Sequence, residues 1–228
     1  MKSFQSQSIY FLICCLGSFL FSSCGGGGSS DSGKEEIVVV DDKKLEDFRN
    51  QLNEVLLQEK KGWKDHWSEA LVDFSPEDFE LFRTDTIDPM EMPERNPILQ
   101  DNPLFNYQFP HPDGNGVMDI YSYKIEAHDA VDRPFLNPDS EVAWYRGDGM
   151  KERLLFMGPS GMFEEGIWLD PAKFLVLGYF HEEAGFRPMA WLIDVESHVL
   201  WQFQHEKVAK NYVQDSYLNT KIRKVEFS

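Results

Sequence analysis

The sequence predicts an α+β fold, mainly β, in which one or more N-terminal helices pack on antiparallel sheets. Three observations carry this prediction. An amphipathic segment lies near the N-terminus, from residue 41 onward. From residue 117 onward, segments rich in β-branched and aromatic residues alternate with turn signals. The chain of 228 residues is 42% hydrophobic and 14% aromatic, which is enough apolar surface for the core of one domain.

The charge balance argues against two classes of partner. Lys and Arg number 22 against 39 Asp and Glu, which gives a formal net charge of −17. Binding to nucleic acid is driven by Lys and Arg on phosphates, so we expect no nucleic acid partner. The same surplus of acids opposes a polybasic contact with anionic lipid. With 18 Phe, 8 Tyr and 6 Trp, the chain is also not a wholly disordered acidic protein.

The first 23 residues are predicted to be a signal peptide. They contain one charge, Lys2, followed by the apolar run 9–21. As a helix, these 13 residues would span about 20 Å, which is shorter than the hydrocarbon core of about 30 Å. A weakly positive start, a short apolar stretch and then small residues are typical of a secretory signal rather than of a membrane span.

The apolar run ends in Phe21-Ser-Ser-Cys24, and four glycines follow. This resembles the lipobox of bacterial lipoproteins, with Phe21 where Leu is usual. The resemblance implies cleavage before Cys24 and its acylation, with palmitate among the chains. Gly25 is not Asp, which implies the outer membrane. Only Cys14, Cys15 and Cys24 are present, so the mature chain would keep one cysteine without a disulfide partner. An ordinary signal peptide with an incidental Cys24 is the alternative.

After Cys24, a Gly/Ser-rich tether is predicted up to residue 40, and a helical segment over 41–87. The first helix is expected from residue 41 to Gly62, because Leu45, Phe48, Leu52, Val55 and Leu56 form one apolar stripe. Ser75 followed by Pro76 predicts the start of a second helix of about two turns. Phe79 and Phe82 are expected to form its buried side.

Residues 88–116 are predicted to form an extended wrap, because they hold six of the twelve prolines. Within it, Phe105, Tyr107 and Phe109 alternate as in an edge strand. Residues 117–228 are predicted to be the antiparallel β portion of the same domain. Its expected strands are 117–127, 141–146, 151–157, 166–170, 173–180, 188–195 and 199–204, with 174–180 as a central strand.

The β portion contains a weak internal period. Trp144 and Trp191 lie 47 residues apart, as do Phe156 and Phe203. Residues 190–203 resemble the outer hairpin of a blade in quinoprotein-like or WD-like β-propellers. The resemblance implies blade-like antiparallel sheets. Residues 117–228 hold too few such periods for a closed propeller, which uses at least about four blades.

One loop carries a metal-binding pattern. Residues 111–120 resemble the calcium loops of FG-GAP repeats, with His111 where the first Asp belongs. The resemblance implies calcium held by Asp113, Asn115 and Asp119, since Ca²⁺ prefers oxygen ligands. A Gly-Asn-Gly turn entering the next strand is the alternative. No other cofactor is predicted.

No convincing catalytic set is present. Glu164, Glu165 and Asp170 could supply the paired acids of a glycosidase, although 39 acids make such a pair unspecific. Trp63 and Trp67 follow a predicted helix among charged residues, and are therefore the candidate binding residues expected to be partly exposed.

The leading hypothesis is an exported envelope protein, held at the outer membrane by lipidated Cys24 and acting as a non-catalytic binding or assembly module. Its partner would be an envelope protein or a glycan. One alternative is an envelope glycan hydrolase that uses Glu164, Glu165 and Asp170. Another is an acidic inhibitor or immunity-type protein that blocks a cationic enzyme, with binding that depends steeply on salt.

Overall fold

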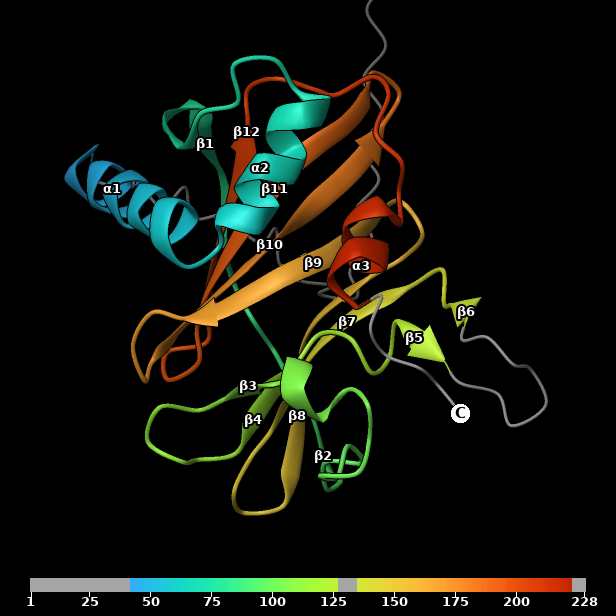
Figure 1. Cartoon of the computed structure of the whole chain (residues 1–228). Helices are drawn as coiled ribbons and strands as arrows, with labels where there is room; N and C mark the ends of the chain where they lie inside the picture. The colour runs from blue at the N-terminus through green and yellow to red at the C-terminus, as the bar shows by residue number, and fades with distance from the viewer. Residues whose placement is uncertain (1–41, 127–134, 223–228) are drawn as a thin grey trace, which may run out of the picture. The chain divides into compact units, whose positions relative to one another are not determined.

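A computed structural model describes residues 42–126 and 135–222 (Figure 1). The predicted signal peptide, Cys24 and the tether lie outside the described residues. The helical elements are α1 (Asp42–Gln58), α2 (Lys61–Ala70), η1 (Pro76–Asp78), η2 (Phe105–Tyr107) and α3 (Ser216–Lys221). The described part of the chain contains no helix long and apolar enough to cross a membrane.

The strands form two larger antiparallel sheets and one small pair. The first sheet has the order β1-β12-β11-β10-β9, with β1 (Phe79–Thr86), β9 (Gly161–Trp168), β10 (Lys173–Glu182), β11 (Gly185–Asp194) and β12 (Val199–His205). The second sheet has the order β2-β8-β7-β4-β3, with β2 (Met90–Pro93), β3 (Phe109–Pro110), β4 (Val117–Asp119), β7 (Ser140–Tyr145) and β8 (Met150–Met157). β5 (Ile125–Glu126) pairs with β6 (Phe135–Leu136). The predicted α+β fold, mainly β, is confirmed.

The helices cover one face of the first sheet, here called the helix face (Figure 1). Phe48 of α1 stacks on Phe203 of β12, with ring centroids 3.5 Å apart. Trp67 of α2 packs on Tyr179 of β10, with ring centroids 6.3 Å apart. The apolar stripe of α1 is buried in these contacts, so the first predicted helix is confirmed.

The second sheet packs on part of the opposite face. Phe109 of β3 contacts Phe174 of β10 edge to face, with ring centroids 5.5 Å apart. Trp144 of β7 contacts Trp168 of β9, with ring centroids 6.2 Å apart. Two aromatic contacts thus join the sheets at one end of the first sheet.

The helical segment predicted over 41–87 is wrong over residues 79–86, which form β1. Ser75 does act as an N-cap, since its Oγ accepts a hydrogen bond from the Glu77 amide at 3.2 Å. The helix that it caps is only the 3₁₀ turn η1, and the chain enters β1 at Phe79. Phe79 is buried, but Phe82 is 57% exposed and does not form the expected buried side. The helix α2 was not predicted.

The later strands follow the sequence more closely. The hairpins β7–β8 and β11–β12 carry the 47-residue period, and they lie in different sheets. β10 lies between β9 and β11 with both faces buried, as predicted for 174–180. The strand predicted over 117–127 is instead split into β4 and β5 by a turn. In the Pro-rich segment, β3 is an edge strand, while Phe105 and Tyr107 belong to η2.

Candidate functional site

Glu164 and Glu165 are consecutive in β9, so a regular strand would point them to opposite faces. A β-bulge prevents this. Against β10, Leu177 pairs with Glu165 and Gly178 pairs with Phe163, which leaves Glu164 as the extra residue. A bulge redirects a side chain locally. Both carboxylates therefore reach the helix face, where their hydrogen-bond partners lie.

Glu164 is fully buried and is held by three aromatic donors. The indole nitrogens of Trp63 and Trp67 donate to its Oε2 at 2.8 and 3.0 Å, and the hydroxyl of Tyr212 donates to its Oε1. Burial raises the pKa of Glu164 to about 7, although these three hydrogen bonds favour the charged form. The pKa of this carboxyl group therefore lies near neutral pH, although the group is shielded from solvent.

The exposure predicted for Trp63 and Trp67 is wrong, because both side chains are 0% exposed. They are four residues apart on α2, which places both on the side of the helix that faces the sheet. A buried indole N–H needs an acceptor, and Glu164 provides it for both residues. The two tryptophans belong to the core and present no surface to a ligand.

Glu165 has a different environment, although it is also buried. Lys60 donates to its Oε1 at 3.0 Å, and Lys221 and Tyr217 donate to its Oε2. Burial opposes ionisation of Glu165, but the two ammonium groups outweigh it and lower the pKa of this carboxyl. Glu165 is therefore a charged acid that already has its partners.

A pocket of about 400 Å³ opens beside Glu165. His66 lies on its wall, with Nε2 2.8 Å from the Oγ of Ser216, and burial lowers the pKa of this imidazole. The lining residues are Glu59, Lys60, Gly62, His66, Glu165, Tyr217, Thr220 and Lys221. Two acids and two lysines balance one another in this pocket, so it has no excess charge that selects a ligand.

The third acid of the hydrolase hypothesis does not join the other two. Oδ1 of Asp170 accepts hydrogen bonds from the amides of Ala172 and Lys173, both at 2.8 Å, and so shapes the turn before β10. Glu164 is out of reach of solvent, and Glu165 is neutralised by lysines. The structure therefore does not bring Glu164, Glu165 and Asp170 together as an open catalytic pair.

The residues of the predicted calcium loop have separate partners. Oδ1 of Asp119 accepts hydrogen bonds from the amides of Tyr121 and Ser122, and this carboxylate is buried. Oδ1 of Asn115 accepts from the amide of Gly147 at 3.3 Å. The side chain of Asp113 is exposed. These three residues do not fit a calcium ion, and no group of three or more His, Cys, Asp and Glu in the described ranges could hold a metal.

The same loop has the geometry of a turn. Gly114 and Gly116 have φ values of +76° and +89°, which favour glycine. A Cβ on Gly116 would lie 2.0 Å from the carbonyl oxygen of Tyr145. The glycines thus let the chain turn closely into β4, which is the alternative explanation of the motif.

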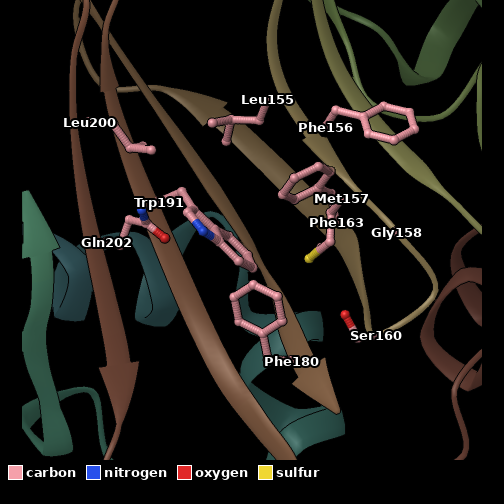
Figure 2. A pocket seen from close by; sticks show the side chains of 10 residues that line it. All are labelled: Leu155, Phe156, Met157, Gly158, Ser160, Phe163, Phe180, Trp191, Leu200 and Gln202. Atoms are coloured by element: carbon pink, nitrogen blue, oxygen red, sulfur yellow. The ribbon is translucent and has the colours of Figure 1, made fainter. Parts of the chain in front are cut away.

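A second pocket, here called the apolar groove, lies on the uncovered part of the first sheet (Figure 2). Its volume is about 320 Å³. It is lined by Leu155, Phe156, Met157, Gly158, Ser160, Phe163, Phe180, Trp191, Leu200 and Gln202. Figure 2 shows Trp191, Phe180 and Gln202 on one side and Leu155 and Met157 on the other, while the ring of Phe156 is turned away from Trp191. The groove therefore lies between the first sheet and β8.

Sequence analysis did not identify this groove, because its residues come from five different strands. The 47-residue period does not mark the groove either. Trp191 and Phe156 line it, but their partners in the period do not, since Trp144 contacts Trp168 and Phe203 stacks on Phe48 at the helix face.

Comparison with known proteins gives no relative. No family model matches the chain, and neither a curated protein nor a solved structure gives a significant match.

Proposed function

We propose that this chain is an exported, lipid-anchored envelope protein that acts as a non-catalytic binding module, with the apolar groove as its ligand surface. The observation that carries the proposal is the groove itself. Aromatic and aliphatic side chains dominate its lining, and Ser160 and Gln202 supply the few polar groups. This composition is typical of ligand pockets in proteins.

The exposed residue of the groove supports the same proposal. Phe156 is 49% exposed at the rim of this groove, whose lining side chains are mainly apolar. Burying apolar area is worth about 25 cal/mol per Å². A ligand that covers Phe156 and fills the groove would therefore gain binding free energy that the isolated protein does not use.

The proposed anchor would keep this surface near the membrane. The resemblance of Phe21-Ser-Ser-Cys24 to a lipobox supports acylation of Cys24, and the glycines after it support a flexible connection to the folded part. A tethered module can meet envelope partners while it stays attached to lipid.

The test is site-specific photo-crosslinking in cells that make the protein. A photoreactive residue at Gln202 lies on the groove, and the matched control is the same residue at Leu99, which is 65% exposed and lies outside the groove. We expect a discrete adduct from position 202 and none from position 99. Equal labelling from both positions, or none from position 202, would overturn the proposal.

A glycan panel tests the absence of catalysis. We expect no hydrolysis by the wild type, because Glu164 is shielded and Glu165 is paired with Lys60 and Lys221. Hydrolysis that disappears in Glu165→Gln would instead support the glycan hydrolase. If the adduct at position 202 is a cationic enzyme whose activity falls on binding, the protein would be the acidic inhibitor.

A further inference from the structure

β8 is paired on both sides over only part of its length. β2 pairs with residues 150–153 of β8 and reaches no further along it, since the first residue of β2, Met90, lies opposite Arg153. Immediately after this point, the register of β8 against β7 shifts, with Leu155 opposite Val142 and Arg153 opposite Ala143. Leu154 is the extra residue of this bulge. Bulges commonly end strand pairing.

Residues 154–157 consequently have one free edge. β7 pairs with one side of them, and among the described residues no strand pairs with the other side. In an antiparallel ladder, successive residues turn their N–H and C=O groups alternately toward one neighbour and the other. About half of the backbone groups of 154–157 therefore point to this edge without a strand partner.

The apolar groove lies along the same edge. Leu155, Phe156 and Met157 are consecutive, and all three line the groove. Consecutive side chains of a strand point to opposite faces, so a pocket that touches all three meets the strand at its edge. The edge toward β7 is already paired, which leaves the free edge.

We infer that the free edge of β8 over residues 154–157 binds an extended segment of a partner protein as an added antiparallel or parallel strand. The inference rests on the proposed function, since it takes the groove as the ligand surface. Backbone hydrogen bonds to β8 give such a segment its affinity, and alternate side chains enter the groove against Trp191 and Leu200. The partner segment should therefore carry apolar residues at every second position.

The charge of the protein favours basic residues at the other positions of this segment. The net charge of −17 attracts cations and speeds their encounter with the surface. An added strand that alternates apolar and basic residues fits both the apolar groove and the negative charge of the protein. It also pairs the free backbone groups of this edge, which natural proteins otherwise protect against pairing with the wrong chain.

The test uses four fluorescent heptapeptides, in which Lys alternates with Val, Leu, Phe or Tyr. Each has a counterpart with the same side chains but with N-methyl groups on alternate amides, which removes the donors of one edge. Binding to the mature protein isolated from cells is measured by anisotropy. We expect at least one peptide to bind at least ten times more tightly than its N-methylated counterpart, and the amides of 154–157 to gain protection from hydrogen exchange.

A protein variant provides the second control. Phe156→Ser should weaken binding at least tenfold, whereas Phe105→Ser should leave it unchanged, since Phe105 is 42% exposed in η2 and outside the groove. Strand addition is overturned if the N-methylated peptides bind equally well, or if no peptide binds while crosslinking at position 202 succeeds. Failure of the crosslinking as well would instead reject the groove as a ligand surface.

Discussion

Glu164 and Glu165 show how two neighbouring buried acids can have pKa values shifted in opposite directions. Both are buried, and an isolated buried carboxylate is costly. Glu165 meets two ammonium groups, so its charge is compensated. Glu164 meets only neutral donors, namely two indoles and a phenol. Hydrogen bonds from neutral groups offset part of the desolvation, but they do not cancel the charge.

Replacement of Glu164 by Gln should remove a pH dependence of stability. The folded-state pKa is raised from 4.5 to about 7, so the folded protein binds this proton more tightly than the unfolded chain does. The contribution to stability is full below pH 4.5 and is lost as the pH rises through 7. From 1.36 kcal/mol per pKa unit, the loss is about 3 kcal/mol. Denaturant unfolding of wild type and E164Q between pH 5 and 8 measures it.

The geometry suits this substitution. The carbonyl oxygen of the new amide could accept from Trp63 and Trp67, and its NH₂ group could donate to the hydroxyl oxygen of Tyr212, which reverses the hydrogen bond that Tyr212 donates to Glu164. We therefore expect E164Q to match the wild type near pH 5 and to exceed it near pH 8. A wild type that gains stability over E164Q with rising pH would contradict the raised pKa. The pH dependence of stability that Glu165 contributes has the opposite sign, since the lowered pKa of Glu165 gives stability that is lost on acidification.

The roles of these residues could be predicted only in part. The sequence identifies the acids and the two tryptophans, and the spacing of Trp63 and Trp67 is that of one helix face. Their charged neighbours suggest exposure, however, because the acceptor Glu164 lies 101 and 97 residues further along the chain. Burial here is decided by a long-range partner that no local pattern contains.

Among the secondary-structure elements, the bulged strand β9 is the one that creates the acid site. Its neighbour β10 has a glycine at the bulge, and a Cβ on Gly178 would lie 2.0 Å from the carbonyl oxygen of Met162. The glycine lets the two backbones approach at this point. The position of both carboxylates therefore depends on a residue that touches neither of them.

Replacement of Gly178 by Ala should destabilise the protein. The new methyl group meets backbone rather than a flexible side chain, and overpacking of this kind costs about 1–3 kcal/mol or more. The matched control is Gly62→Ala in α2, where a Cβ has no heavy atom within 4 Å. This control should be neutral or stabilising by up to about 1 kcal/mol, because Ala favours a helix. Thermal unfolding compares both variants, and equal melting temperatures would refute the packing argument.

The loop 111–120 should not respond to calcium. The side chain of Asp119 already accepts hydrogen bonds from the amides of Tyr121 and Ser122. The side chain of Asn115 accepts one from the amide of Gly147. A cation would have to break these hydrogen bonds. We expect the melting temperature to stay constant up to millimolar calcium. A rise that disappears in Asp113→Ala would restore the metal site that the motif predicts.

Helices and strands were predicted most accurately where the sequence pattern that indicates them lies within the element itself or in the turns beside it. The strands after residue 140 combine β-branched residues with short turns, and the structure places β7, β8 and β10 to β12 within a few residues of the prediction. β1 was missed because Ser75 and Pro76 also begin a 3₁₀ turn. α2 was missed because only two aromatic residues mark its apolar side.

For the molecule as a whole, the location in the cell is predicted only by the N-terminal sequence. Cys24→Ala should move the protein from the membrane fraction to the soluble fraction, because the acyl chains supply the membrane affinity. Incorporation of labelled palmitate should disappear in the same variant, while Cys15→Ala, in the predicted signal peptide, should keep it. An unlabelled wild-type chain, or unchanged fractionation of C24A, would exclude the lipid anchor.

The fold class could be predicted from the sequence, but the arrangement of the two sheets could not. Pairing of hairpins within a sheet is largely local, as for β11 and β12. Which sheet receives each hairpin depends on contacts such as Phe109 with Phe174, far apart in the sequence. The groove results from this arrangement, because it lies on the part of the first sheet that the second sheet does not cover.

The contacts of β9 connect both ends of the described chain. Trp63 precedes Glu164 by 101 residues, and Lys221 follows Glu165 by 56 residues. During synthesis, the last of these contacts cannot form until residue 221 has left the ribosome. The acid site can therefore be completed only after α3 has been made, because β9 needs partners from both sides of it in the sequence.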